Sequence, residues 1–123
     1  MLSPNLMLNR ILNEFPDFKA QWEDSLFRGD DGSFTYHGLF SELSWYVRDH
    51  FGQMDEQKRE SLFDLIELSI SEEDRSDLEN AVCTCFLENL ASEPLSPELK
   101  GYMKDKTREY FEQWDNPARH RAT

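Results

Sequence analysis

The sequence predicts an all-α fold, a single compact domain of five to six helices, on three observations. Apolar residues recur at intervals of three or four over most of the chain, as on one face of an amphipathic helix. No stretch alternates apolar and polar side chains with the β-branched enrichment of a strand. The prolines stand near the starts and ends of the periodic segments. We expect an antiparallel bundle or a short solenoid-like arrangement.

The first two helices are separated by a proline. Ser3-Pro4 opens the first, because proline is tolerated in the first turn of a helix. It ends before Pro16, since a residue that precedes proline disfavours helical backbone. Pro16 begins the second helix. The apolar stripe of that helix recurs every four residues, at Phe18, Trp22 and Leu26.

The clearest loop is Gly29-Asp30-Asp31-Gly32-Ser33, whose residues accept positive φ or bond their own backbone. A third helix follows over about 35–51, and Gly52 is expected to end it as a left-handed cap. The fourth and fifth helices are predicted over about 55–70 and 73–90. Ser96-Pro97-Glu98 starts a sixth, which should run to about residue 114.

Length and composition fit one folded unit. A chain of 123 residues with 38% apolar and 13% aromatic residues can bury a single core. We place the domain at residues 1–116 and a flexible tail at 117–123, because Asn116-Pro117 breaks the last helix. The chain shows neither a signal-peptide pattern at its start nor a run of apolar residues that spans a membrane, so we expect a cytoplasmic protein.

The negative charge is concentrated in one part of the chain. Residues 53–95 hold twelve acidic and three basic residues, which is nine of the formal net charge of −12. This charge argues against binding to nucleic acid and to anionic membranes, both of which require clustered basic residues. A partner with a basic surface is the natural complement.

No pattern in the sequence supports a cofactor, a metal site or a catalytic group. A calcium loop that began at Asp30 would need glutamate at its twelfth position, where Ser41 stands. The three histidines, His37, His50 and His120, are not spaced as zinc ligands.

The two cysteines also lack a functional pattern. Cys83-Thr84-Cys85 is not a C-x-x-C motif, and a disulfide between these residues is geometrically poor on a helix. We expect Cys85 in the core and Cys83 partly exposed.

Acidic residues at the start of the fifth helix have two explanations. Glu72, Glu73, Asp74 and Asp77 favour the positive end of the helix dipole there, or they serve solubility. Like charges one turn apart destabilise a helix, so an excess across two helices favours selection for a partner. We therefore predict partner binding by these four acids, with Asp30 and Asp31 as a second patch.

Three segments carry a family resemblance. The run Asn80-Ala81-Val82-Cys83-Thr84-Cys85-Phe86-Leu87-Glu88-Asn89-Leu90 resembles a signature of small helical bacterial proteins encoded beside polymorphic toxins. Phe15-Pro16-Asp17-Phe18 with Trp22, and Tyr36-x-x-Leu39-Phe40, are similar to the same group. Those proteins are regarded as immunity proteins. The resemblance implies binding to a cognate toxin and carries no site residues.

The leading hypothesis is an immunity protein that covers the basic active-site cleft of its toxin with an acidic helical face. Aromatic anchors supply much of the affinity at such interfaces. The candidates here are Tyr36, Trp45 and Tyr46. The alternative is a non-enzymatic adaptor or regulatory subunit, homodimeric or not, in which the acidic face serves solubility. A third possibility is an enzyme whose nucleophile and base are distant in sequence.

Overall fold

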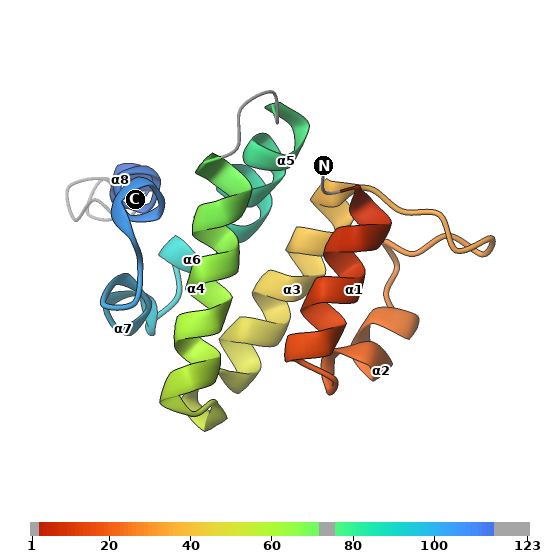
Figure 1. Cartoon of the computed structure of the whole chain (residues 1–123), viewed down its shortest axis with the longest axis horizontal. Helices are drawn as coiled ribbons and strands as arrows, with labels where there is room; N and C mark the ends of the chain where they lie inside the picture. The colour runs from red at the N-terminus through yellow and green to blue at the C-terminus, as the bar shows by residue number, and fades with distance from the viewer. Residues whose placement is uncertain (1–2, 72–75, 115–123) are drawn as a thin grey trace.

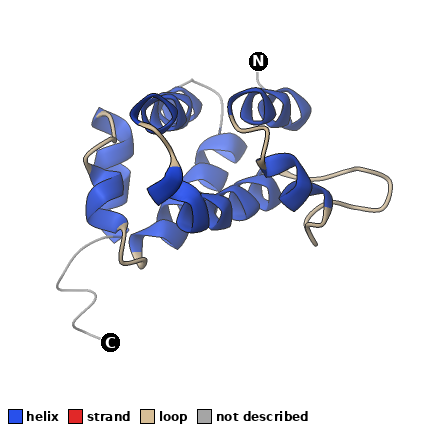
Figure 2. Ribbon diagram, turned by 90° about the horizontal axis from the view of Figure 1, so that it is seen from below, coloured by secondary structure: helices blue, strands red, loops and turns tan. Residues whose placement is uncertain are grey.

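The computed structural model describes residues 3–71 and 76–114, and Figure 1 shows how their helices are arranged. Within these ranges the secondary structure is helical, as Figure 2 also shows, which confirms the predicted all-α class. Here too, no helix is long and apolar enough to cross a bilayer. The predicted tail at 117–123 lies outside the described residues.

The first helix follows its sequence signals. α1 (Pro4–Glu14) begins after Ser3, whose Oγ accepts a hydrogen bond from the Leu6 amide at 3.3 Å. It ends at Phe15, before Pro16, as predicted.

α2 (Phe18–Glu23) is shorter than the predicted second helix. The backbone leaves the helix at Asp24, so Leu26 does not continue the stripe of Phe18 and Trp22. The Leu26 side chain is 99% exposed, and its predicted place in the core is therefore wrong.

α3 (Tyr36–His50) is the central helix. Thr35 caps it, with its Oγ1 accepting a hydrogen bond from the Gly38 amide at 3.1 Å. The helix packs against α1, α2, α5 and the segment after α5. Its buried apolar side chains join those of the neighbouring helices in one core; the largest of these are Phe18, Phe40, Phe51, Phe63, Phe86 and Phe111.

Gly52 does not form the predicted left-handed cap. It lies inside a 3₁₀ turn, η1 (Phe51–Gln53), that continues the chain from α3. Among the described glycines only Gly32 has a positive φ, at 84°. The prediction failed because the 3₁₀ turn ends α3 and needs no left-handed residue.

The residues predicted to form one helix over 73–90 form three successive helical segments in the structure. After α4 (Glu56–Ser71) come α5 (Ser76–Ala81), a π-helical segment η2 (Val82–Leu87) and α6 (Glu88–Ala91). A π-helix takes more residues per turn than an α-helix, which rotates side chains to other faces. This reverses the predicted roles of the two cysteines, since Cys83 is 9% exposed and Cys85 is only half-buried.

The predicted sixth helix is two helices. α7 (Ser96–Lys100) stops at Gly101, and α8 (Asp105–Trp114) starts four residues later. Arg108 supports the break, since its Nη2 donates hydrogen bonds to the carbonyl oxygens of Lys100 and Met103 at 3.1 and 3.4 Å. α8 packs against α4, α6 and η2.

Candidate functional site

The most exposed apolar side chains near α3 lie at the loop between α2 and α3. Leu26 is 99% exposed, Phe27 37% and Trp45 40%. The Phe27 and Trp45 rings lie 5.6 Å apart, with their planes inclined by 41°. Asp30 and Asp31 follow in the same loop, which extends away from the helices in Figure 1. We call Leu26, Phe27, Asp30, Asp31 and Trp45 the loop surface.

A glycine makes room for the aromatic pair. A Cβ atom added to Gly38 would lie 2.7 Å from the Cβ of Phe27, closer than real Cβ atoms approach. Phe27 therefore packs directly on the α3 backbone at this point. Ser25 orients the entering chain, because its Oγ accepts a hydrogen bond from the Phe27 amide at 3.1 Å.

The acidic tip of the loop is held by its own hydrogen bonds. Asp31 Oδ1 accepts from the Ser33 amide at 3.0 Å and from the Ser33 hydroxyl at 2.7 Å. The bonds from Ser33 lower the pKa of Asp31, so this carboxylate stays charged. The Gly29 amide donates to the carbonyl of Ser33 at 2.8 Å, and Gly32 supplies the positive φ that closes the turn.

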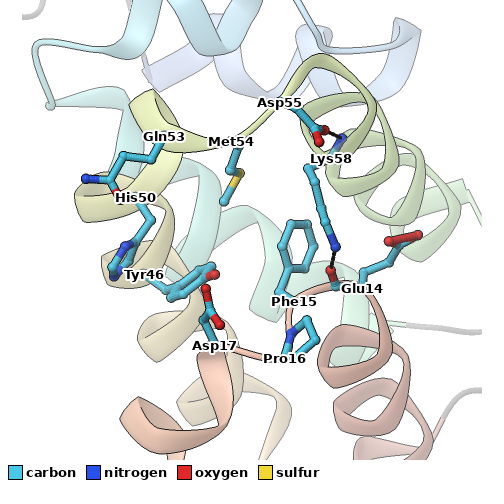
Figure 3. Close-up of a pocket in the computed structure, with 10 residues that line it drawn as sticks. All are labelled: Glu14, Phe15, Pro16, Asp17, Tyr46, His50, Gln53, Met54, Asp55 and Lys58. Carbon is cyan, nitrogen blue, oxygen red and sulfur yellow. Dashed lines mark hydrogen bonds between the residues drawn. The ribbon is translucent and has the colours of Figure 1, made fainter.

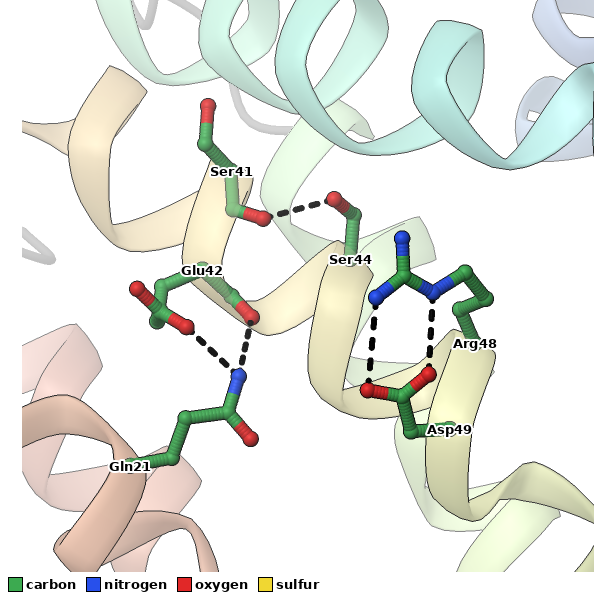
Figure 4. Close-up of polar contacts among 6 residues, drawn as sticks. All are labelled: Gln21, Ser41, Glu42, Ser44, Arg48 and Asp49. Atoms are coloured by element: carbon green, nitrogen blue, oxygen red, sulfur yellow. Dashed lines mark hydrogen bonds and ion pairs between the residues drawn. The ribbon is translucent and has the colours of Figure 1, made fainter. Parts of the chain in front are cut away.

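Below the loop surface, a polar contact ties α2 to α3. Gln21 Nε2 donates to the buried Glu42 carboxylate at 2.6 Å and to the Glu42 carbonyl at 3.3 Å (Figure 4). Glu42 lies one turn before Trp45, so this contact fixes the two ends of the loop relative to the aromatic pair. Nearby, Arg48 and Asp49 form an exposed ion pair at 2.9 Å.

The predicted acidic patch is described only in part. Glu72, Glu73 and Asp74 lie outside the described residues, and Asp77 is exposed in the first turn of α5.

Other acids in the same stretch bind groups of their own chain. Glu56 and Glu79 accept hydrogen bonds from the hydroxyls of Tyr102 and Tyr110, each at 2.6 Å. Asp64 pairs with Lys104 at 3.3 Å. Some of these acids therefore have a structural role, which sequence reasoning missed because their partners lie 31 to 46 residues away.

The predicted aromatic anchors differ in their placement. Trp45 lies on the loop surface, and Tyr36 is half-buried in the first turn of α3. Tyr46 is 5% exposed and packs edge-on against Phe18, with ring centroids 5.4 Å apart. Tyr46 belongs to the core and is not an exposed anchor. Phe27 was missed because its exposure depends on its contact with Gly38.

The described residues do not assemble a metal centre. No three His, Cys, Asp or Glu side chains within them gather closely enough to hold a metal ion. Burial, aided by the charge of Glu79, raises the pKa of the Cys83 thiol to about 11, which leaves little thiolate near neutral pH.

Comparison with known proteins gives one result. No curated protein and no solved structure matches the chain. The model of the family described as "Domain of unknown function (DUF7674)" matches residues 8–119, which is most of the chain, and the protein belongs to that family.

Proposed function

We propose that this protein is an immunity protein that binds and neutralises a cognate toxin, and that the loop surface contacts the toxin. The observation that carries the proposal is the exposed Phe27–Trp45 pair, which is followed in the chain by the acidic loop tip. Tryptophan is enriched among the residues that dominate binding energy. Exposed apolar side chains that adjoin one another on a small domain are typical of interaction sites.

Charge points to a basic partner. The segment 23–31 carries Glu23, Asp24, Asp30 and Asp31 against Arg28 alone. The whole chain has a formal charge of −12. Complementary charge speeds association toward about 10⁸ M⁻¹s⁻¹ at low salt, which suits an inhibitor that must act before damage occurs. Toxins that act on nucleic acids or nucleotides offer such basic clefts.

We place the contact with the toxin on the loop surface and not on the acidic residues of α4 and α5. Several of those acids already accept hydrogen bonds from α8 or from Tyr102 in the turn before it, so they are less available to a partner. The exposed apolar residues also suit the alternative function, an adaptor or regulatory subunit that self-associates through the same surface. Partner chemistry and oligomeric state separate the two.

The test begins with coexpression of the domain and the proteins encoded beside it, followed by purification of the complex and an assay of toxicity. Trp45→Ala should raise the dissociation constant by about 30-fold, as for a central anchor. Leu26→Ser should weaken binding without loss of stability. Leu6→Ser, at a residue that is 50% exposed on α1, is its matched control and should change neither.

The charge component has its own test. Asp30→Asn with Asp31→Asn should slow association and flatten its dependence on ionic strength. Glu60→Gln with Glu88→Gln removes the same charge from exposed positions elsewhere and should alter the rate less. Loop-surface variants with unchanged affinity would refute the proposed contact. A dimer that forms through Trp45 and has no effect on toxicity would favour the adaptor.

A further inference from the structure

A separate cleft lies where the α1–α2 turn, the end of α3 and the start of α4 meet. It has a volume of about 250 Å³ and is drawn in Figure 3. Pockets for drug-sized ligands begin at roughly 300 Å³, so this one suits a smaller group, such as a single side chain. The cleft is lined by Glu14, Phe15, Pro16, Asp17, Tyr46, His50, Gln53, Met54, Asp55 and Lys58.

The Tyr46 hydroxyl is a polar group of the cleft that no described residue hydrogen-bonds. Tyr46 as a whole is only 5% exposed, and its hydroxyl makes no hydrogen bond to another described residue. No buried polar side-chain atom of the described residues lacks a partner, so this hydroxyl is in contact with solvent in the cleft. Figure 3 shows this hydroxyl directed into the cleft, toward the carboxylate of Asp17. A ligand that enters the cleft can replace water at this hydroxyl with a hydrogen bond of its own.

The charges around the cleft favour a cation. Three acidic residues line the cleft, Glu14, Asp17 and Asp55, and the one lysine among the lining residues is Lys58. Lys58 is already engaged, since it donates to the Glu14 carbonyl and lies 5.5 Å from the centre of the Phe15 ring. Asp55 Oδ1 accepts a hydrogen bond from the Lys58 amide at 2.8 Å. The Asp17 carboxylate does not cap α2, and its charge acts on the neighbouring Tyr46 hydroxyl, whose pKa is raised by burial and by Asp17.

Aromatic rings complete the site. The rings of Tyr46 and His50 lie 4.6 Å apart, inclined by 33°, and Phe15 forms another part of the wall. A guanidinium group is planar, stacks on aromatic faces and donates paired hydrogen bonds to a carboxylate. An ammonium group is more strongly hydrated and lacks this planar fork.

We infer that this cleft binds the guanidinium group of an arginine side chain of the partner protein, with Asp17 and the Tyr46 hydroxyl accepting its N–H groups. The source of the arginine rests on the proposed function, since a basic partner would present it. The geometry of the cleft does not depend on that function. The arginine would be a second contact, distinct from the loop surface.

The experiment titrates the whole domain with N-acetyl-arginine methylamide and follows its amide NMR signals. We expect shifts near Asp17 and from Tyr46 to Gln53, with a dissociation constant on the order of 1 mM for so small a ligand. The citrulline analogue, which has the same shape without charge, should bind at least about tenfold more weakly. The lysine analogue should bind more weakly than arginine, and inorganic phosphate should not bind.

Variants locate the binding. Asp17→Asn should weaken arginine binding by about tenfold. Glu23→Gln removes the same charge from an exposed residue of α2 outside the cleft and should change binding by less than about twofold. Tyr46→Phe should weaken binding by roughly threefold while leaving the thermal midpoint unchanged, because the hydroxyl holds no structural bond.

Several outcomes would overturn the inference. These are the absence of shifts at about 30 mM arginine analogue, equal binding of the citrulline analogue, or equal effects of Asp17→Asn and Glu23→Gln. Free arginine that binds much more tightly than the blocked form would assign the cleft to a small molecule and overturn the protein source. A cleft that does not bind arginine refutes this inference alone, whereas loop-surface variants with unchanged partner affinity refute the proposed contact alone.

Discussion

Glu67 of α4 caps the start of α8 through Thr107. Its Oε1 accepts hydrogen bonds from the Thr107 amide at 2.9 Å and from the Thr107 hydroxyl at 2.8 Å. Its Oε2 accepts from the Lys106 amide at 3.4 Å. These amides belong to the first turn of α8, where no intrahelical acceptor exists. A carboxylate 40 residues away in the sequence thus acts as the N-terminal cap of α8.

Glu67→Ala should lower the free energy of unfolding by about 2 kcal/mol, because it leaves the buried Thr107 hydroxyl and amide without this acceptor. Urea denaturation followed by circular dichroism measures the change.

Glu60→Ala is the matched control for that prediction. Glu60 is exposed on the same helix, so both variants make the same helix-favouring change, and its effect should stay within about 0.5 kcal/mol. Equal effects of the two variants would mean that the Glu67 cap adds nothing to stability.

Gly38→Ala should destabilise the domain by about 2 kcal/mol and shift Trp45 fluorescence. The added methyl group meets the Cβ of Phe27 at 2.7 Å, so Phe27 must move away from its place beside Trp45.

Gly52→Ala should raise the stability of the domain. Nothing lies within 4 Å of a Cβ built at Gly52, and its φ is not positive. A gain of about 0.5 kcal/mol is expected from the lower entropy of the unfolded chain.

Unaltered Trp45 fluorescence in Gly38→Ala would disprove the proposed packing of Phe27.

Stability should fall as the pH rises above about 9. Burial raises the pKa of Cys83 from 9.0 to about 11, so the unfolded chain loses this proton first. The contribution is complete below pH 9 and is lost as the pH rises through about 11, for a total of roughly 2 kcal/mol. Urea titrations of the wild type and of Cys83→Ala across this range measure it; the variant should show a shallower decline.

Thiol labelling should distinguish the two cysteines. Iodoacetamide at pH 8 should modify the half-buried Cys85 first, and Cys83 at least about tenfold more slowly, because only the thiolate reacts. Mass spectrometry of peptides at timed intervals resolves the sites. Faster modification of Cys83 would contradict its placement inside the π-helical segment.

Local signals were enough to predict much of the fold. Ser3, Pro4 and Pro16 bracket α1 as predicted, and the periodic apolar residues of α3 and α4 give those helices their buried faces. Each signal acts over one or two helical turns, so it can be recognised in sequence.

The misplaced residues depend on more distant contacts. Periodicity continued the second helix through Leu26, and regular α-helical winding was assumed from 73 to 90, where a π-helical segment instead buries Cys83. The break between α7 and α8 is likewise supported by Arg108 and Glu67, whose partners no local pattern reveals.

Some residues of the candidate site could be predicted from the sequence, and others depended on tertiary contacts. The sequence singled out Asp30, Asp31 and Trp45, while Phe27 required the contact with Gly38 and Tyr46 proved to be a core residue. By itself, the sequence determined the helical class, most helix starts and the acidic balance, since these follow from residue type and short-range spacing. Only tertiary packing decided which carboxylates hold the domain together and which aromatic side chains stay exposed, because burial and hydrogen bonding depend on residues brought together across the chain.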